Sequence, residues 1–518
     1  MDKFIKMLDY IKGDNILEKI AVIELKTTSV KMQIVDIVRN KLFEPTKTLE
    51  MPINLTKDFY GDLFIKPNVI KEITNILLVF KKIIESYECT DTICLASDML
   101  KEAKNVNGFI DELSVITGFK FRVLDFEESA LALYTSVINT FNRPKAVIFN
   151  ILDNSTEVVL YNRRNILNKV IIPYGCVSVY DKMSDKTIDE KYDEIFKSVK
   201  KELEESNLKN DLPEEFDLIG AGDMFKYYGA VCRKAKKYPI EIAHNFTSSK
   251  QDMEKVYNLM KGLDVGSATK IKGIPLHDSK YFPSAMIIIK ALIDNFEKDE
   301  FSISKFGRAD GMLFHNVIPL TIEKPISDTL GFSLQSINEY YDRKPNNSTH
   351  IYELCMILFK QLRVLHKLPR PYVKVLRIAG YLSNGGYRVD VENSDRSVFD
   401  VIKNSTIMGV SHTDIIMGAF VCLCKNSDNF NLAEWVKYKE YLNEEDLSAV
   451  KKLAVILKIA EALDITGFGL ITDISCDILG DSVIMKTITT DNANFEINYT
   501  SLCNADFKKI FAKNLEVL

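Results

Sequence analysis

The sequence predicts the α/β fold class, with two similar lobes followed by a mainly helical domain that carries a small terminal sheet. The first observation is an internal repeat, because residues 21–35 (AVIELKTTSVKMQIV) and residues 147–161 (VIFNILDNSTEVVLY) each contain an apolar strand, a short polar turn and a β-branched strand. The second is that strand and helix patterns alternate after each copy. The third is a change to helical stripes from about Asp328.

The repeat predicts where the two lobes lie. The two copies are 126 residues apart, measured from Glu24 to Asn150, and the same shift places Ser29 on Ser155. A duplicated strand–turn–strand unit keeps its turn at the same end of its sheet. We therefore expect the two polar turns to face one cleft. The expected domains are a first lobe at residues 1–142, a second lobe at residues 143–325 and a helical domain at residues 326–518.

The rest of the first lobe predicts alternating helices and strands. Residues 65–87 show helical spacing with Pro67 in the first turn, and residues 92–97 (TICLAS) predict a buried strand. Residues 121–126 (FRVLDF) predict a further strand, which a helix follows at residues 127–140. This alternation is typical of a parallel or mixed sheet covered by helices.

The second lobe and the C-terminal domain continue the pattern. A long charged helix is predicted near residues 188–205, and a strand at residues 217–222 (DLIGAG). Residues 474–499 predict strands punctuated by Gly-Asp and Asp-Asn-Ala. Two apolar stripes predict helices: Leu354, Leu358, Leu362 and Leu365 in one, and Leu453, Ile456, Leu457, Ala460 and Leu463 in the other.

The composition argues against several classes of protein. The 518 residues are 46% hydrophobic and 27% charged, and the formal net charge is −5 without a polybasic tail; no nucleic-acid partner is therefore expected. The nine cysteines are odd in number and scattered, as in a reduced cytoplasmic protein. The longest apolar stretches have about ten residues, fewer than a bilayer span needs, and residues 1–15 lack an apolar signal core. We expect a cytoplasmic protein with no membrane partner.

Seven motifs follow one another in the order found in one family. They are ELKTTS (24–29), ASDMLKEAKN (96–105), FEESAL (126–131), NILDNSTE (150–157), PYGCV (173–177), GAGDM (220–224) and SKFGRADGML (304–313). Each motif alone is weak, whereas seven in order across roughly the first 315 residues are specific. Together they resemble the motifs of the exopolyphosphatase / guanosine pentaphosphate phosphohydrolase (Ppx/GppA) family.

The resemblance implies both a fold and an activity. It implies a duplicated actin-like core of the ribonuclease-H-like (ASKHA) type, an HD-related helical C-terminal domain and a homodimer. An active member would use Mg²⁺ to remove a terminal phosphate from polyphosphate or guanosine pentaphosphate. In such a reaction a carboxylate orients the attacking water, while the metal and backbone donors neutralise charge.

The resemblance also implies phosphate-binding turns, which this sequence alters. Family members have glycines there, because a phosphate nest needs unusual backbone angles and a close approach without a Cβ. Here Lys26 replaces a glycine of the first turn, and Leu152, Asp153 and Asn154 replace the three glycines of the second. Asp153 would repel a phosphate by about 1 kcal/mol or more. The implied phosphate-binding residues are Lys26, Thr27, Thr28, Ser29, Asp153, Asn154, Ser155, Thr156, Gly220 and Gly222.

The catalytic positions are altered as well. The acid that opens the family's second turn motif is Asn150 here, which cannot act as a base, whereas Glu157 is kept. The glutamate thought to activate water falls on Ser129 when the motif is aligned without a gap, and on Glu128 after a one-residue slip. Glu24 replaces an aspartate and is a weak candidate ligand for Mg²⁺.

The histidines do not match a metal site in the helical domain. An HD site needs a histidine, a His-Asp pair and a further aspartate. The only His-Asp dipeptide, His277-Asp278, precedes the helical domain, and residues 383–386 (SNGG) stand where the family would have a histidine-bearing loop. We expect no transition metal there. His366 and His412 are the residues that would hold one if this expectation is wrong.

Two functional hypotheses follow. One is an exopolyphosphatase-like protein with weak or absent hydrolysis and a cleft retained for a ligand or partner. The alternative is an active Mg²⁺-dependent enzyme that uses substitute carboxylates. The altered residues favour the first. Residues 220–223 should lie on the second-lobe wall of the cleft and residues 127–129 on the first-lobe side, with Lys26, Leu152 and Asp153 filling the phosphate pocket.

Overall fold

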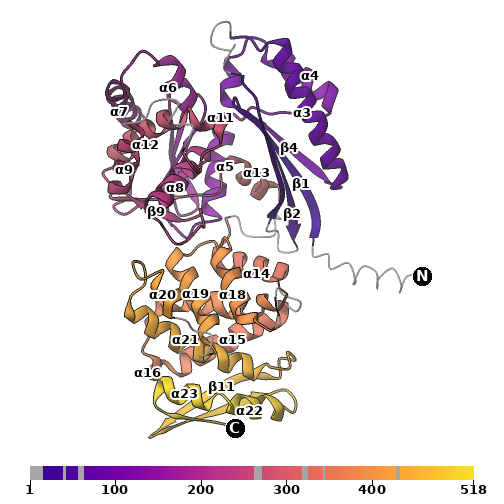
Figure 1. Cartoon of the computed structure of the whole chain (residues 1–518), viewed down its shortest axis with the longest axis vertical. Helices are drawn as coiled ribbons and strands as arrows, with labels where there is room; N and C mark the ends of the chain where they lie inside the picture. The colour runs from indigo at the N-terminus through magenta and orange to yellow at the C-terminus, as the bar shows by residue number, and fades with distance from the viewer. Residues whose placement is uncertain are drawn as a thin grey trace, which may run out of the picture. The chain divides into compact units, whose positions relative to one another are not determined.

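The computed structural model divides into two compact units (Figure 1). Unit 1 comprises Met1–Tyr238 and Ala243–Thr329, and unit 2 comprises Pro239–Ile242 and Leu330–Leu518. The charged segment 1–15, in which we expected no signal core, lies outside the described residues. The structure describes residues 16–38, 43–55, 63–261, 271–317, 325–341, 345–388, 390, 392–426 and 432–518.

The first lobe of unit 1 is built on a four-stranded mixed sheet with the order β3-β2-β1-β4. β1 pairs antiparallel with β2 and parallel with β4. The predicted helix at 65–87 forms as α3 with its proline in the first turn, and it buries Ile73, Leu77 and Phe80. The strands are β1 (Ile16–Leu25), β2 (Ser29–Val38), β3 (Phe43–Pro52) and β4 (Asp91–Ala96).

The second lobe repeats this connectivity in a six-stranded sheet with the order β7-β6-β5-β8-β10-β9. β5 pairs antiparallel with β6 and parallel with β8, as β1 does with β2 and β4. The predicted duplication is therefore confirmed at the level of strand pairing. The strands are β5 (Lys145–Ile151), β6 (Thr156–Asn162), β7 (Asn165–Ile172), β8 (Asp217–Ala221), β9 (Phe246–Ser249) and β10 (Glu300–Ile303).

The two turns of the repeat have the same backbone geometry. In the first, the Lys26 N–H donates to the Ser29 carbonyl at 2.9 Å, and in the second the Leu152 N–H donates to the Ser155 carbonyl at 2.8 Å. The register places Glu24 opposite Lys31 and Asn150 opposite Glu157. Equivalent positions of the two copies thus face equivalent partners.

Two expectations for the first lobe are wrong. The strand expected at 121–126 is reduced to one bridge between Leu95 and Arg122, because Phe126 already begins a helix. That helix, α5 (Phe126–Ile138), does not lie on the first-lobe side. Its apolar face packs on β5, β6 and β8 of the second sheet, in one core cluster with Ile148, Val159 and Ile219.

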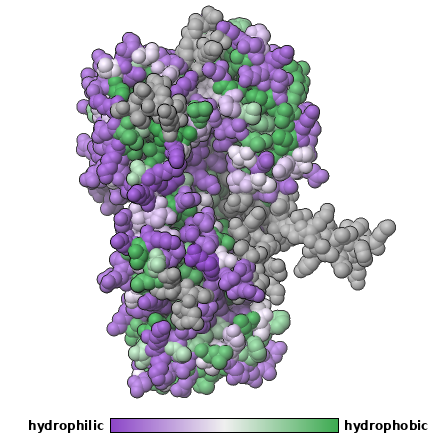
Figure 2. All heavy atoms as spheres, viewed as in Figure 1, coloured by the Kyte–Doolittle hydropathy of each residue, from purple (hydrophilic) through white to green (hydrophobic). Residues whose placement is uncertain are grey.

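The remaining helices of unit 1 cover the two sheets. A green area of Figure 2 lies over α3 and α4. Leu78 and Val79 of α3 and Val115 and Ile116 of α4 are exposed apolar residues. Within the described residues, no helix is both long and apolar enough to cross a bilayer. The helices are α3 (Pro67–Ser86), η1 (Asp98–Glu102), α4 (Val106–Thr117), α6 (Cys176–Lys182), α7 (Ile188–Glu205), α8 (Asp223–Ala235), α9 (Lys250–Lys261), α11 (Leu276–Ser279), α12 (Phe282–Phe296) and α13 (Arg308–Val317).

Unit 2 is mainly helical, as the sequence predicts. Its longest helix is α21, and the five apolar residues predicted to share one of its faces are all buried. The other predicted stripe crosses a helix break at Leu362, so Leu365 belongs to the next helix. The helices are α14 (Thr329–Tyr341), α15 (Pro345–Gln361), α16 (Arg363–His366), η2 (Arg370–Tyr372), α17 (Val373–Leu382), η3 (Gly385–Arg388), α18 (Ser394–Asn404), α19 (His412–Cys424), α20 (Leu432–Val436), α21 (Glu444–Leu463), α22 (Asn494–Ser501) and α23 (Asn504–Phe511).

The terminal sheet of unit 2 differs from the prediction in its third strand. β11 (Ile471–Leu479) and β12 (Ser482–Thr489) form the predicted hairpin. The residues expected to follow as a strand instead form α22, which buries Glu496 and Thr500 at helical spacing. The third strand is β13 (Asn514–Val517), which pairs parallel with β12.

Candidate functional site

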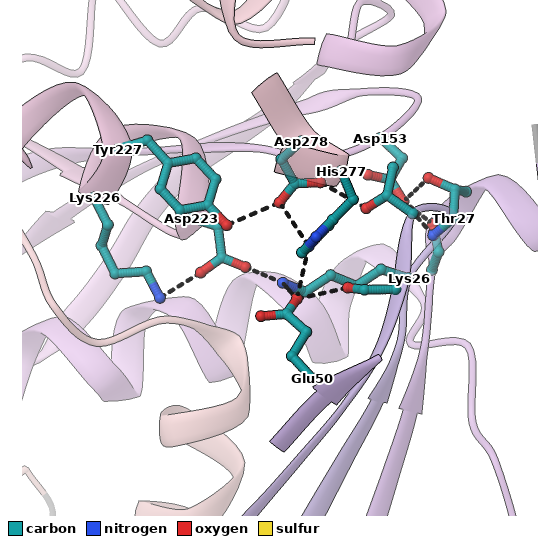
Figure 3. A network of polar contacts seen from close by, with 12 residues as sticks. Lys26, Thr27, Glu50, Asp153, Asp223, Lys226, Tyr227, His277 and Asp278 are labelled. Atoms are coloured by element: carbon teal, nitrogen blue, oxygen red, sulfur yellow. Dashed lines mark hydrogen bonds and ion pairs between the residues drawn. The ribbon is translucent and has the colours of Figure 1, made fainter. Parts of the chain in front are cut away.

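The two duplicated turns meet each other across the interface between the lobes. Thr27 and Asp153 occupy equivalent positions of the repeat, and the Asp153 Oδ2 accepts hydrogen bonds from the Thr27 N–H at 3.3 Å and the Thr27 hydroxyl at 2.9 Å (Figure 3). The Ser97 hydroxyl donates to the same oxygen at 2.6 Å. Three donors therefore converge on one anionic oxygen, an arrangement suited to an oxyanion.

An aspartate at the start of the first helix after β4, and another after β8, each contact the turn of the opposite lobe. Asp98 opens η1 and accepts a hydrogen bond from the Ser155 hydroxyl at 2.8 Å. Asp223 opens α8 and forms an ion pair with Lys26 (Figure 3). Lys226 also pairs with Asp223, one turn further along α8. The two contacts are equivalent. In each lobe, the carboxylate of the first residue of a helix contacts the turn of the other lobe.

The two carboxylates differ in charge environment. Burial and the neighbouring Asp153 carboxylate raise the pKa of Asp98 to about 6. Burial also opposes ionisation of Asp223, but Lys226 and Lys26 hold the pKa of its carboxyl well below its usual range. The substituted Lys26 is therefore a structural counter-ion of Asp223, in a turn where the family has glycine.

A second row of contacts joins the lobes beside Lys26 (Figure 3). The buried Asp278 accepts hydrogen bonds from the Thr28 hydroxyl at 2.6 Å and from the Tyr227 hydroxyl at 2.8 Å. His277 Nε2 lies 3.2 Å from Glu50 Oε1 on β3. These contacts between the lobes form what we call the seam. The His277-Asp278 dipeptide, which lies outside the helical domain, thus contributes both of its side chains to the seam.

The family's acidic pair is replaced by an amide–carboxylate pair. The Asn150 amide donates to Glu157 Oε2 at 2.9 Å, and both residues are buried. Gly222, with φ +82°, approaches Asn150 so closely that a Cβ would lie 2.2 Å from Asn150 Oδ1. Mg²⁺ prefers anionic oxygen ligands, whereas here an N–H donor is directed at the kept carboxylate. These residues do not fit a magnesium site. Glu24, the weak third candidate, lies opposite Lys31 in the first sheet.

The two candidates for the water-activating position point in different directions. Ser129 is buried, and its hydroxyl accepts a hydrogen bond from Arg308 at 3.0 Å. Glu128 is half-exposed, caps the N-terminus of α5 and pairs with Arg122. Arg308 belongs to the last family-like motif and influences Asp98 electrostatically. The ungapped alignment, with Ser129 toward the seam, is therefore the one that agrees with the side-chain geometry.

Most of the other candidate phosphate ligands have protein partners. The Ser29 hydroxyl donates to Glu50 at 2.6 Å, the Asn154 amide to Glu102 at 2.6 Å and the Thr156 hydroxyl to the Tyr174 carbonyl at 2.7 Å. Gly220 lies within β8, where a Cβ would collide with the ring of Phe225. The polar groups of these turns are engaged within the protein.

Sequence reasoning did not name Glu50, Ser97, Asp98 or Arg308 as site residues, and it placed Asp223 only as the end of the cleft wall expected at residues 220–223. The repeat gives a signal for Asp98 and Asp223. In each lobe a parallel strand, β4 or β8, lies beside the first strand of the repeat, and one of these aspartates begins the helix that follows it. The sequence gave no comparable signal for Glu50. This residue lies on the edge strand β3, and the pairing of that strand is known only from the fold.

Unit 2 contains a close contact between a partly buried histidine and a buried aspartate. His350 Nδ1 lies 3.1 Å from Asp464 Oδ2, and its Nε2 is 2.8 Å from the Ile471 carbonyl. Neither residue was among the candidates from sequence. His366 contacts the Phe359 carbonyl through Nε2 at 2.7 Å. Among the residues that the structure describes, no three His, Cys, Asp or Glu side chains are grouped as metal ligands would be.

Comparison with known proteins supports the family resemblance. The model of the Ppx/GppA phosphatase family matches residues 35–318, more than half of the chain. A curated relative is the bifunctional 3-dehydroquinate synthase/phosphatase of Fusobacterium nucleatum subsp. nucleatum, 26% identical over 331 residues, 61% of this chain and 49% of that protein. The chain therefore spans about half the length of this relative.

Solved structures show the same fold at low identity. The Aquifex aeolicus member of the Ppx/GppA family is 18% identical with a TM-score of 0.51, over 59% of this chain and 99% of that chain. An exopolyphosphatase from Cytophaga hutchinsonii is 16% identical with a TM-score of 0.52, over 58% of this chain and 98% of that chain. The two-lobed core described above is thus the actin-like α/β core of these proteins.

Proposed function

Because the chain belongs to the Ppx/GppA phosphatase family, we propose that it is an exopolyphosphatase-like protein with weak or absent phosphohydrolase activity. Its inter-lobe cleft would be retained to bind a ligand or partner. The observation that carries the proposal is the Asp153 carboxylate, which already occupies the three donors contributed by Thr27 and Ser97. A phosphate oxygen would have to displace that carboxylate and overcome its charge.

The reacting groups argue in the same direction. General-base catalysis needs a carboxylate within reach of the attacking water. In the ungapped alignment Ser129 takes that position, where it bonds to Arg308, and Asn150 replaces the acid that would face Glu157. The substitute carboxylates of the alternative hypothesis are engaged elsewhere: Glu128 with Arg122, and Asp153 with the opposite turn. The proposed function does not depend on Mg²⁺, because Asn150 and Glu157 do not fit a magnesium site.

The first test is phosphate release from long-chain polyphosphate with Mg²⁺, beside a family member with intact glycine turns. We expect at least about a hundredfold lower turnover, because a general base and oxyanion donors each contribute about two orders of magnitude. Guanosine pentaphosphate is the second substrate to assay. Turnover near that of the intact homologue would establish the alternative, an active Mg²⁺-dependent phosphohydrolase.

The second test addresses Asp153 directly. Asp153→Gly should free the three donors, so that tripolyphosphate binds at least roughly tenfold more tightly than to the wild type, because an internal competitor lowers the fraction of competent sites. Isothermal titration calorimetry measures the dissociation constants. Asp185→Gly, which alters an exposed turn of the same lobe, is the matched control. Equal affinity of wild type and Asp153→Gly would contradict the role given to Asp153.

The rest of the proposal follows the family. We infer that unit 2 is an HD-related domain that has lost its metal, that the protein is a cytoplasmic homodimer and that its ligand is a polyphosphate-like anion or a protein. Metal analysis of the purified protein and sedimentation of the full chain test the first two inferences. A stoichiometric ion that is lost on substitution of His366 or His412 would show that unit 2 still binds a metal.

A further inference from the structure

His277 lies where an element of the second lobe meets an edge strand of the first. It belongs to the short helix α11, and its Nε2 is 3.2 Å from Glu50 Oε1 on β3 and 3.7 Å from Asp278 Oδ2. The side chains of His277 and Glu50 are 13% and 24% exposed. Water is partly excluded, so the charge of the imidazole affects the contact more strongly than at an open surface.

Charged groups of both signs surround this contact (Figure 3). Lys26 lies 3.7 Å from Glu50 and pairs with Asp223, which also pairs with Lys226. Asp278 is held by the hydroxyls of Thr28 and Tyr227. Lys31 lies opposite Glu50 in the strand register and also acts on that carboxylate. Protonated His277 adds one positive charge beside Glu50 and Asp278.

Loss of one proton removes that charge. A neutral His277 leaves the half-buried Glu50 and the buried Asp278 with one cation fewer, and an uncompensated carboxylate is costly where water is excluded. The neutral ring also replaces a charge-assisted hydrogen bond to Glu50 by a weaker neutral one. Both effects weaken the attachment of α11 to β3.

We propose that His277 is a proton-dependent latch between the two lobes, which holds the cleft closed when protonated and loosens it when neutral. The latch extends the proposed function, because it governs access to the same cleft, yet it requires no statement about hydrolysis. A ligand or partner that needs the lobes apart would bind more readily as the pH rises.

The pKa shifts agree with this direction. The hydrogen bond to Glu50 raises the pKa of His277, while burial opposes the rise. Burial also acts against ionisation of Glu50, but the bond to His277 and the charge of Lys26 lower its pKa to about 2. The closing contribution of His277 is complete below its ordinary pKa and is lost as pH rises through its raised value. The closing contribution of Glu50 is lost only at acidic pH, as the pH falls toward its lowered pKa of about 2.

Two measurements on the full chain test the latch. The pKa of His277 is measured by NMR titration of the six histidines, with the signal assigned by its absence in His277→Gln. Amide exchange of a peptide covering residues 24–29 reports closure, since the Thr27 N–H bonds across the seam. The rates are corrected for intrinsic exchange. Between about pH 6 and about pH 9, the protection factor of this peptide should then fall by roughly tenfold for each unit by which the pKa of His277 is raised.

The variants separate the latch from general instability. In His277→Gln, protection at about pH 6 should already equal that of the wild type at about pH 9. Glu50→Gln keeps the ring and should lower the pKa of His277, which provides the test if His277→Gln does not fold. His315→Gln, at an exposed position of α13, is the control and should behave as the wild type. A His277 pKa at or below its ordinary value, or protection that does not change with pH, would overturn the latch, whatever the hydrolysis assay shows.

Discussion

At the scale of single residues, the substituted positions have acquired specific partners. Lys26 pairs with Asp223 and Asp153 accepts the donors of Thr27 and Ser97, so two of the altered turn residues bond across the seam. A third altered residue, Asn150, donates a hydrogen bond to Glu157 within the second sheet. Each of these three replacements is thus bonded to a polar group of the protein, and loss of a partner by a buried polar group costs free energy.

Restoring the family's acid should expose this dependence. Asn150→Asp would place a second carboxylate against Glu157, and we expect the free energy of unfolding to fall by about 2 kcal/mol at neutral pH. The loss should fade as the pH falls, because the pair can then share a proton. Mg²⁺ should stabilise the variant and leave the wild type unchanged. Denaturant titration with and without Mg²⁺ measures this, and an equally stable variant without Mg²⁺ would refute it.

At the scale of elements, α5 and α13 form a tight pair that positions Ser129 and Arg308. A Cβ on Gly311 would lie 1.8 Å from the Ala132 carbonyl oxygen, so the two helices touch backbone to backbone at this point. The second glycine of the last family-like motif is thus explained by helix packing, and phosphate binding need not be invoked for it. Because α5 also packs on the second sheet, the pair ties the serine position to the second lobe.

A methyl group at this contact should force the helices apart. Gly311→Ala should lower the free energy of unfolding by roughly 1–3 kcal/mol, the usual cost of overpacking. Gly108→Ala on α4 is a matched control of opposite sign, because a Cβ there meets nothing within 4 Å, and it should stabilise the protein by up to about 1 kcal/mol. Thermal unfolding compares the two. A neutral Gly311→Ala would mean that the helix pair is more adaptable than its geometry indicates.

At the scale of the whole molecule, two histidines of unit 2 have pKa shifts of opposite sign. In unit 2, the close contact with the Asp464 carboxylate raises the pKa of His350 against the effect of burial. Burial lowers the pKa of His366. The two shifts act in different pH ranges, because the first favours the charged imidazole and the second the neutral one.

Unit 2 should therefore be most stable near the ordinary histidine pKa of about 6.5. The contribution of His350 is present below that value and is lost as pH rises through its raised pKa, whereas that of His366 is present above it and is lost as pH falls through its lowered pKa. Trp435, the single tryptophan of the chain, is buried in this unit and reports its unfolding by fluorescence. In His350→Gln the decline on the alkaline side should disappear. An unchanged alkaline decline would assign it to another group.

By itself, the sequence determined the duplicated strand–turn–strand unit, the family and most helices, because these rest on local periodicity and on the spacing of motifs. It also located the altered turns. Only the tertiary structure decided that α5 packs on the second sheet, that residues 494–501 form a helix and that Ser129, not Glu128, points toward Arg308. It alone joined Asp153 to Thr27 and Ser97, and His277 to Glu50. Such contacts link residues far apart in the chain, and their geometry arises only when two sheets, each stable through its own core, come together.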